Sequence, residues 1–276
     1  MEKTTTITAK DGIELFTRSW TPPQYKAIVA LVHGFGEHSG RFQHVAAFLN
    51  KNGYAVVALD LRGHGKSGDK RGHSPSNETT YDDIELFIRH AKTIGGETLP
   101  LFLYGHSMGG NFILNTILRR NTEGVHGLVT TGPLISLAFK PKPLMLFLGK
   151  TLRSIAPRFS QPGGVQTQYL SHDPAVVQAY INDPLVHGTI TTAAGMNLLE
   201  SSDYLNTYEG TMPVPTLMMH GTEDFLTYQP ASEAFASRVK GNITYRKWEG
   251  LYHEIHNEPE KIQVLEEIVA WLDTYI

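Results

Sequence analysis

The sequence predicts an α/β fold with a mostly parallel central sheet, flanking helices and an inserted, mainly helical cap. Short apolar runs alternate along the chain with stretches whose apolar residues recur every three or four positions. Each run is bounded by glycine or proline and is apolar on both faces, which is typical of strands buried in a parallel sheet. Strands and helices that alternate in this way build a sheet covered on both sides. The chain has 276 residues, 41% of them apolar, which suffices for one such domain with an insertion.

Two kinds of strand are expected. Segments 4–9 and 13–20 alternate polar and apolar residues and are separated by Asp11-Gly12, so they predict a hairpin. A further strand is expected at 243–248, at the end of the series. The continuous apolar runs predict buried strands at 27–32, 54–59, 99–104, 125–130 and 214–219.

Helices are expected between these strands, at 42–51, 81–93, 108–119, 230–239 and 259–274. The last of them has the clearest pattern, because its aliphatic residues share one helical face. These residues are Ile262, Leu265, Ile268, Val269 and Leu272.

The alternation stops after the strand at 125–130. The following stretch has no clear strand, and we expect a cap at 133–201 inserted into a core formed by 1–132 and 202–276. Its apolar segment 144–155 has two interpretations: an ordinary buried helix, or a lid that touches a lipid surface. The second interpretation rests on its basic flanks, which are Lys140, Lys142, Lys150 and Arg153.

Composition excludes several classes of protein. Lys and Arg total 24 and Asp and Glu total 27, a formal charge of −3, whereas nucleic-acid binding needs a concentrated basic surface. The absence of cysteine excludes disulfides, thiolate metal sites and a cysteine nucleophile. No signal peptide precedes the first strand, and no run reaches the roughly 18 apolar residues of a membrane span. We therefore expect a cytoplasmic protein, associated with membranes or lipid droplets only peripherally.

The candidate nucleophile is Ser107, within Gly105-His106-Ser107-Met108-Gly109. A predicted strand precedes this motif and a predicted helix follows it. A serine on such a sharp turn needs small residues two positions to either side, and Gly105 and Gly109 supply them. The turn exposes the hydroxyl above the sheet edge, at the N-terminus of the helix.

A serine nucleophile needs a base to take its proton and a carboxylate to orient that base. On this architecture the expected order along the chain is serine, acid, histidine. Asp224 and His253 each follow a predicted strand, which places them at the same sheet edge as Ser107. We predict His253 as the base and Asp224 as its partner. Glu223 and Asp203 stay open as alternative acids.

Backbone amides must meet the oxyanion that forms during ester hydrolysis. One donor is expected to be Met108, directly after the nucleophile. The other is expected to be Phe35, in the loop His33-Gly34-Phe35-Gly36 after the strand at 27–32. Since the functional atom is the amide, the Phe35 side chain is free to line the pocket.

Several motifs are distributed over nearly the whole chain. They are His33-Gly34-Phe35-Gly36-Glu37-His38-Ser39-Gly40-Arg41, Asp60-Leu61-Arg62-Gly63-His64-Gly65-Lys66-Ser67, Gly105-His106-Ser107-Met108-Gly109-Gly110, Asn182-Asp183-Pro184-Leu185, Gly221-Thr222-Glu223-Asp224 and Tyr252-His253-Glu254-Ile255-His256. Together they resemble the monoacylglycerol lipase and lysophospholipase group of the serine α/β-hydrolases. The resemblance implies an α/β-hydrolase fold with an apolar cap over an acyl tunnel.

The resemblance also matches the glycerol-binding groups of that family to Glu37, Arg41 and His256. Independently, Glu37 and Arg41 are spaced for an ion pair on one helical face, and His256 follows the predicted base by three residues. The alternative is a structural salt bridge and a surface histidine. Phe35 departs from the family, in which small residues are common at that position, so the acyl-chain preference stays open.

We therefore expect a serine hydrolase that cleaves monoacylglycerol to glycerol and a free fatty acid through an acyl-enzyme. The same residues fit a lysophospholipase or a general carboxylesterase, and a noncatalytic lipid-binding module is the rival from another class. No cofactor or metal is expected, because the pairs His253/His256 and His33/His38 lack the H-E-x-x-H arrangement. The expected partners are a lipid ester and, through the cap, a membrane surface; no nucleic acid and no oligomeric state are predicted.

Overall fold

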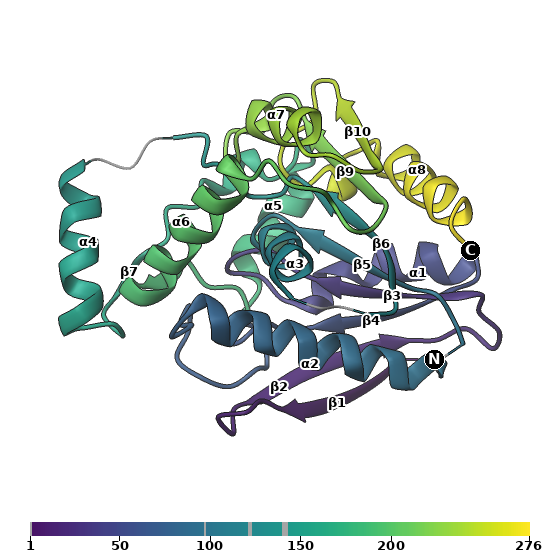
Figure 1. The fold of residues 1–276 in the computed structure, drawn as a ribbon, viewed down its shortest axis with the longest axis horizontal. Helices are drawn as coiled ribbons and strands as arrows, with labels where there is room; N and C mark the ends of the chain where they lie inside the picture. The colour runs from purple at the N-terminus through teal and green to yellow at the C-terminus, as the bar shows by residue number, and fades with distance from the viewer. Residues whose placement is uncertain (1, 97, 121–122, 140–142) are drawn as a thin grey trace.

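Figure 1 shows the computed structural model of the chain, which describes residues 2–96, 98–120, 123–139 and 143–276. One large sheet runs through the molecule in the order β1-β2-β4-β3-β5-β6-β9-β10. Its strands are β1 (Glu2–Thr8), β2 (Glu14–Trp20), β3 (Ala27–Val32), β4 (Tyr54–Leu59), β5 (Leu101–His106), β6 (Val125–Thr131), β9 (Thr216–Gly221) and β10 (Ile243–Trp248). Each lies where the sequence predicts a strand, within a few residues at the ends.

The sheet is mostly parallel. β1 and β2 form the expected antiparallel hairpin, and β2 pairs antiparallel with β4. All the remaining neighbours are parallel. The carboxyl ends of β3, β5, β9 and β10 therefore meet at one edge of the sheet, where open α/β sheets bind their ligands.

Helices cover both faces of the sheet (Figure 1). Apolar side chains of α1 (Gln43–Lys51) and α8 (Lys261–Asp273) share one core cluster with one face of the strands. Those of α2 (Asn77–Gly95), α3 (Met108–Arg119) and α7 (Gln229–Arg238) share the other. α2 begins four residues before its predicted start at 81, because Ser76 caps it by accepting a hydrogen bond from the amide of Thr79 at 3.1 Å.

The stretch between β6 and β9 is mainly helical, as expected. It contains α4 (Pro143–Ile155), α5 (Pro174–Asn182) and α6 (Thr192–Thr207), and α6 runs through residue 201, where the predicted cap ends. It also contains a pair of short antiparallel strands, β7 (Ser160–Pro162) and β8 (Thr189–Thr191), which the sequence did not indicate because three residues are too few to show a period. Short 3₁₀ helices lie at Ser39–Phe42, Thr167–Tyr169 and Ile255–Asn257.

The interpretation of 144–155 as an ordinary buried helix is wrong. Phe147 is 67% exposed and Ile155 is 76% exposed. Figure 1 shows α4 on the outer side of α6, away from the sheet, so these side chains have no core to enter. Of the predicted basic flanks, Lys150 is exposed and Arg153 pairs with Glu200. Lys140 and Lys142 lie outside the described residues.

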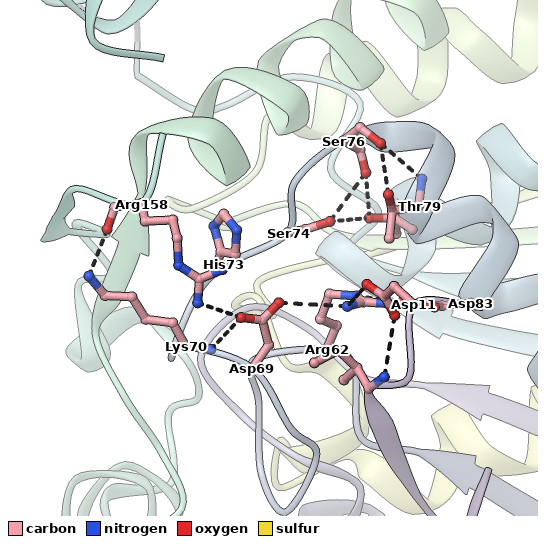
Figure 2. Close-up of polar contacts among 12 residues, drawn as sticks. Asp11, Arg62, Asp69, Lys70, His73, Ser74, Ser76, Thr79, Asp83 and Arg158 are labelled. Carbon is pink, nitrogen blue, oxygen red and sulfur yellow. Dashed lines mark hydrogen bonds and ion pairs between the residues drawn. The ribbon is translucent and has the colours of Figure 1, made fainter. Parts of the chain in front are cut away.

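A polar network joins this stretch to the loop after β4 (Figure 2). Arg158 donates to Asp69 at 2.7 Å, and Lys70 donates to the carbonyl of Arg158 at 2.6 Å. Beneath them, the buried Arg62 makes hydrogen bonds with both Asp83 and Asp11. The loop is thus fixed to the core on one side and to the 133–201 stretch on the other.

Among the described helices, none combines the length and the apolar composition that a membrane crossing requires.

Candidate active site

Ser107 lies on the sharp turn between β5 and α3. Its φ is +52°, a left-handed conformation that costs energy in any residue with a Cβ. The flanking glycines are required there: a Cβ on Gly105 would lie 2.7 Å from the carbonyl oxygen of Gly109, and a Cβ on Gly109 would collide with the carbonyl of Val32. The turn therefore has the geometry that the sequence predicts for a nucleophile elbow.

His253 and Asp224 are in direct contact. The Nδ1 atom of His253 lies 2.6 Å from Oδ2 of Asp224, although 29 positions separate the two residues in the chain. Glu223 makes no such contact, and Asp203 is exposed on α6. Of the three acids considered from the sequence, only Asp224 reaches the imidazole.

Two further partners of Asp224 were not predicted. His220 lies 3.0 Å from Oδ2 through its Nε2 atom, and Thr227 donates to the same oxygen at 2.7 Å. The other oxygen accepts from the amides of Leu226 and Thr227. The position of His220 at the end of β9, four residues before Asp224, is the one signal in the sequence that indicates this contact.

These contacts shift both pKa values. Burial would raise the pKa of Asp224, but the charges and hydrogen bonds of His253 and His220 hold it well below its ordinary value. Burial would lower the pKa of His253, yet the charge and hydrogen bond of Asp224, with the charges of Glu254 and Glu37, raise it above its ordinary value. Asp224 is therefore a carboxylate, and His253 is a stronger base than a free histidine.

Ser107 and His253 line the same cavity, which we call the catalytic cavity; its volume is about 100 Å³. Within the described part of the chain, no hydrogen bond joins the Ser107 hydroxyl to His253, a bond that is often long before substrate binds. Both predicted oxyanion residues, Phe35 and Met108, line the cavity too. Neither of their amides has an acceptor among the described residues. Most of the remaining wall is apolar and includes Leu134, Leu137, Phe139, Leu170, Ile190 and Leu198.

Glu37 and Arg41 form the predicted ion pair, at 2.5 Å. Arg41 also makes two hydrogen bonds, each of 2.7 Å, with Glu254, a buried partner that the sequence did not indicate. Burial opposes ionisation of Glu254, but Arg41 outweighs it and lowers the pKa of Glu254 to about 2. Burial and the negative charge of Glu254 raise the pKa of Glu37. Glu37 and Glu254 border the catalytic cavity, whereas Arg41 lies behind them.

His256 is fully buried and does not border the catalytic cavity. Its ring stacks on Phe42 with a centroid distance of 4.8 Å and contacts His106 at 4.7 Å. Neither ring nitrogen has a hydrogen-bond partner among the described residues. Burial and the neighbouring histidines hold its pKa well below the ordinary value, so the ring is neutral.

A cluster beside the cavity has the ligand types of a metal site. The carboxylates of Glu37 and Glu254 and a ring nitrogen of His106 lie within 4.8 Å of one another. Arg41, however, already makes hydrogen bonds with both carboxylates. The cluster therefore holds an internal cation, and an added metal ion would have to compete with it.

The chain is similar to several known proteins. Residues 23–260 match the sequence profile of the hydrolase family described as serine aminopeptidase, S33. The chain belongs to this family. Its fold, with a mostly parallel sheet and helices on both faces, is the α/β-hydrolase fold of its structural relatives.

Three relatives of this α/β-hydrolase cover almost all of its length. An uncharacterised abhydrolase domain-containing protein of Dictyostelium discoideum is 36% identical over 96% of the chain, which spans 28% of that relative. A monoacylglycerol lipase of Mycolicibacterium smegmatis is 32% identical and covers 96% of this chain and 95% of its own. The crystal structure of a Paleococcus ferrophilus monoacylglycerol lipase is 32% identical, covers 95% of this chain and all of its own, and has a TM-score of 0.86. These relatives place the chain among the carboxylic ester hydrolases of the family.

Proposed function

We propose that this α/β-hydrolase cleaves monoacylglycerols to glycerol and a free fatty acid through an acyl-enzyme on Ser107. The observation that carries the proposal is the 2.6 Å contact between His253 and Asp224 at the wall of the largely apolar cavity that also holds Ser107. The two relatives named as monoacylglycerol lipases support the choice of substrate.

In the proposed mechanism, Ser107 Oγ attacks the ester carbonyl carbon while His253 takes its proton. Asp224 orients the imidazole and stabilises its positive charge, and the amides of Phe35 and Met108 stabilise the oxyanion. The bond to the glycerol oxygen then breaks, with the proton passing from His253 to that oxygen. Water then attacks the acyl carbonyl carbon while His253 takes its proton; the bond to Ser107 Oγ breaks, and the proton passes from His253 to Ser107 Oγ as the fatty acid leaves.

The lining of the cavity combines polar and apolar residues. We place the glycerol head at the end bordered by Glu37, whose carboxyl group offers hydrogen-bond atoms to hydroxyls, and the acyl chain along Leu134, Leu137 and Leu198. Arg41 holds Glu37 in place from behind. His256 acts as a positioning residue in this scheme, since it packs against His106, which borders the cavity.

The test compares hydrolysis of monoacylglycerols, lysophospholipids and p-nitrophenyl esters. The wild type is expected to hydrolyse monoacylglycerols with the highest kcat/KM, and Ser107→Ala is expected to lower kcat by about 10⁶-fold. Ser237→Ala, exposed on α7, is the matched control and keeps full activity. A higher kcat/KM on lysophospholipids would make the chain a lysophospholipase, and on simple esters a general carboxylesterase. Failure of a fluorophosphonate to label Ser107 would instead indicate a lipid-binding module.

We also propose that 133–201 acts as a cap and that the exposed face of α4 contacts a lipid surface while substrate is taken up. Phe147 and Leu148, which are 67% and 45% exposed, are the side chains that support this contact.

A further inference from the structure

A second cavity lies behind the wall of the catalytic cavity. This rear compartment has a volume of about 30 Å³ and lies between the loop after β4, α2, α3 and α6. Leu61, Phe112 and Ala194 line it and do not border the catalytic cavity. Among the residues that the structure describes, three border both spaces, namely Phe35, Met108 and Ile190. These three side chains are therefore the partition between the two.

The ring of Phe35 touches the linings of both spaces. The ring packs edge-on against His64, in the lining of the rear compartment, with the two ring centroids 5.9 Å apart. It also packs edge-on against His187, with the ring centroids 5.8 Å apart. On the front side it lies so close to Gly163, in the lining of the catalytic cavity, that a Cβ there would collide with the ring. The ring thus fills the space between the two cavities.

Both spaces have a mostly apolar lining. Leu134, Leu137 and Leu198 give the catalytic cavity an apolar side. The rear compartment has two polar exceptions, Nε2 of His64 and Oδ1 of Asn197, which are buried without a hydrogen-bond partner among the described residues. Buried polar atoms of this kind need water or a polar group beside them. The ring at the junction therefore separates a second, mostly apolar space from an acyl chain in the front cavity.

We propose that the side chain of Phe35 sets the upper limit of acyl-chain length by closing the catalytic cavity against the rear compartment. The inference rests on the proposed function, in which the acyl chain leads away from Ser107 along the apolar wall. Truncation of Phe35 would join the two spaces while leaving its backbone amide, the proposed oxyanion donor, chemically unchanged. The wild type would then be selective for chains that end before the ring.

The experiment measures one ratio: kcat/KM for monostearoylglycerol divided by kcat/KM for monooctanoylglycerol. Phe35→Ala is expected to raise this ratio at least tenfold, the factor that burial of about two additional methylene groups supplies. Ala194→Phe fills the rear compartment and is expected to leave the wild-type ratio unchanged. In the double variant F35A/A194F the gain is expected to disappear.

Each other outcome overturns the proposal. An unchanged ratio in F35A means that the ring is not the limit, and an equal gain in F35A and F35A/A194F means that the extra space lies elsewhere. If F35A does not fold, Phe35→Leu is measured instead, with a smaller rise expected. The proposed function fails separately, if the wild type hydrolyses no monoacylglycerol. In that case the chain-length preference is measured instead as the rate of labelling of Ser107 by a long-chain fluorophosphonate divided by the rate for a short-chain one.

Discussion

Asp224 has more hydrogen-bond partners than a carboxylate needs in order to orient one histidine. Besides His253, it is bonded by His220, by the hydroxyl of Thr227 and by two backbone amides. A buried carboxylate is stable as an anion only when its oxygens are satisfied in this way. The redundancy keeps Asp224 ionised and fixed in position even before substrate arrives.

Asp224→Asn is expected to lower kcat by about 10³–10⁴-fold, because the amide no longer stabilises the imidazolium or selects the correct tautomer. Glu223→Gln, one residue away, is the matched control and is expected to keep full activity. Steady-state kinetics on one monoacylglycerol measure both. The assignment fails if E223Q is the slow variant and D224N is not.

We assign the loss of activity at low pH to protonation of His253. His253 must be neutral to act as the base, so kcat/KM is expected to fall as the pH is lowered and the imidazole takes up a proton. Because the pKa of His253 is raised, the half-maximal value of kcat/KM is expected above the ordinary histidine pKa of roughly 6.5. In D224N the carboxylate charge is gone while burial remains, so the midpoint is expected to move to lower pH. A midpoint that stays in place in D224N contradicts the assignment of this loss of activity to the pair.

For individual residues, the sequence predicted the site accurately where the structural constraint is local. The turn at Ser107 needs glycines at fixed offsets, so five consecutive residues predict it. The sequence did not indicate Glu254 as the partner of Arg41, because that contact joins residues 213 positions apart and depends on how the 3₁₀ helix at Ile255–Asn257 packs near the loop after β3. The burial of His256 escaped prediction for the same reason, since no local pattern marks a neutral histidine stacked on Phe42.

At the level of elements, α4 differs from every core helix. Its sequence, apolar enough for a core, allowed a buried helix and an exposed lid equally, because hydrophobic content alone does not say whether a partner surface exists. Packing decides the matter: α4 contacts α6 on one side and leaves Phe147, Leu148 and Ile155 exposed on the other. This exposed apolar face, with the exposed Lys150 on the same helix, is the observation on which the proposed lipid contact rests.

Phe147→Asp is expected to reduce the fraction of protein that floats with liposomes of mixed neutral and anionic phospholipid, because a charge on this face opposes insertion among the lipids. The control is Ile276→Asp, which places the same charge on another exposed apolar residue, at the far end of the molecule from α4 (Figure 1). Flotation unaffected by F147D, or reduced equally by both changes, removes the proposed contact.

For the molecule as a whole, Arg62 is the residue that ties several segments together. It joins the hairpin turn at Asp11, helix α2 at Asp83 and its own loop, which in turn holds Arg158 through Asp69 (Figure 2). Arg62 and Asp83 are both nearly fully buried, and burial raises the pKa of Asp83 in spite of the arginine.

Arg62→Met is therefore expected to lower the free energy of unfolding by about 3–5 kcal/mol, since it leaves the Asp83 carboxylate buried without its cation. Urea denaturation measures the loss. Arg246→Met, which breaks the exposed pair with Glu267, is the matched control and is expected to cost less than about 1 kcal/mol. Equal losses of unfolding free energy in the two variants would show that the Arg62 network stabilises the fold no more than an exposed salt bridge does.

The amide of His187 donates to the carbonyl of Gly36 at 2.9 Å, directly beside the loop amide that we assign to the oxyanion. The hydrogen bond that fixes this loop thus comes from the segment leading into β8, which belongs to the 133–201 stretch. Displacement of that segment would break this hydrogen bond, so we expect the position of the oxyanion amide to depend on the segment staying in place.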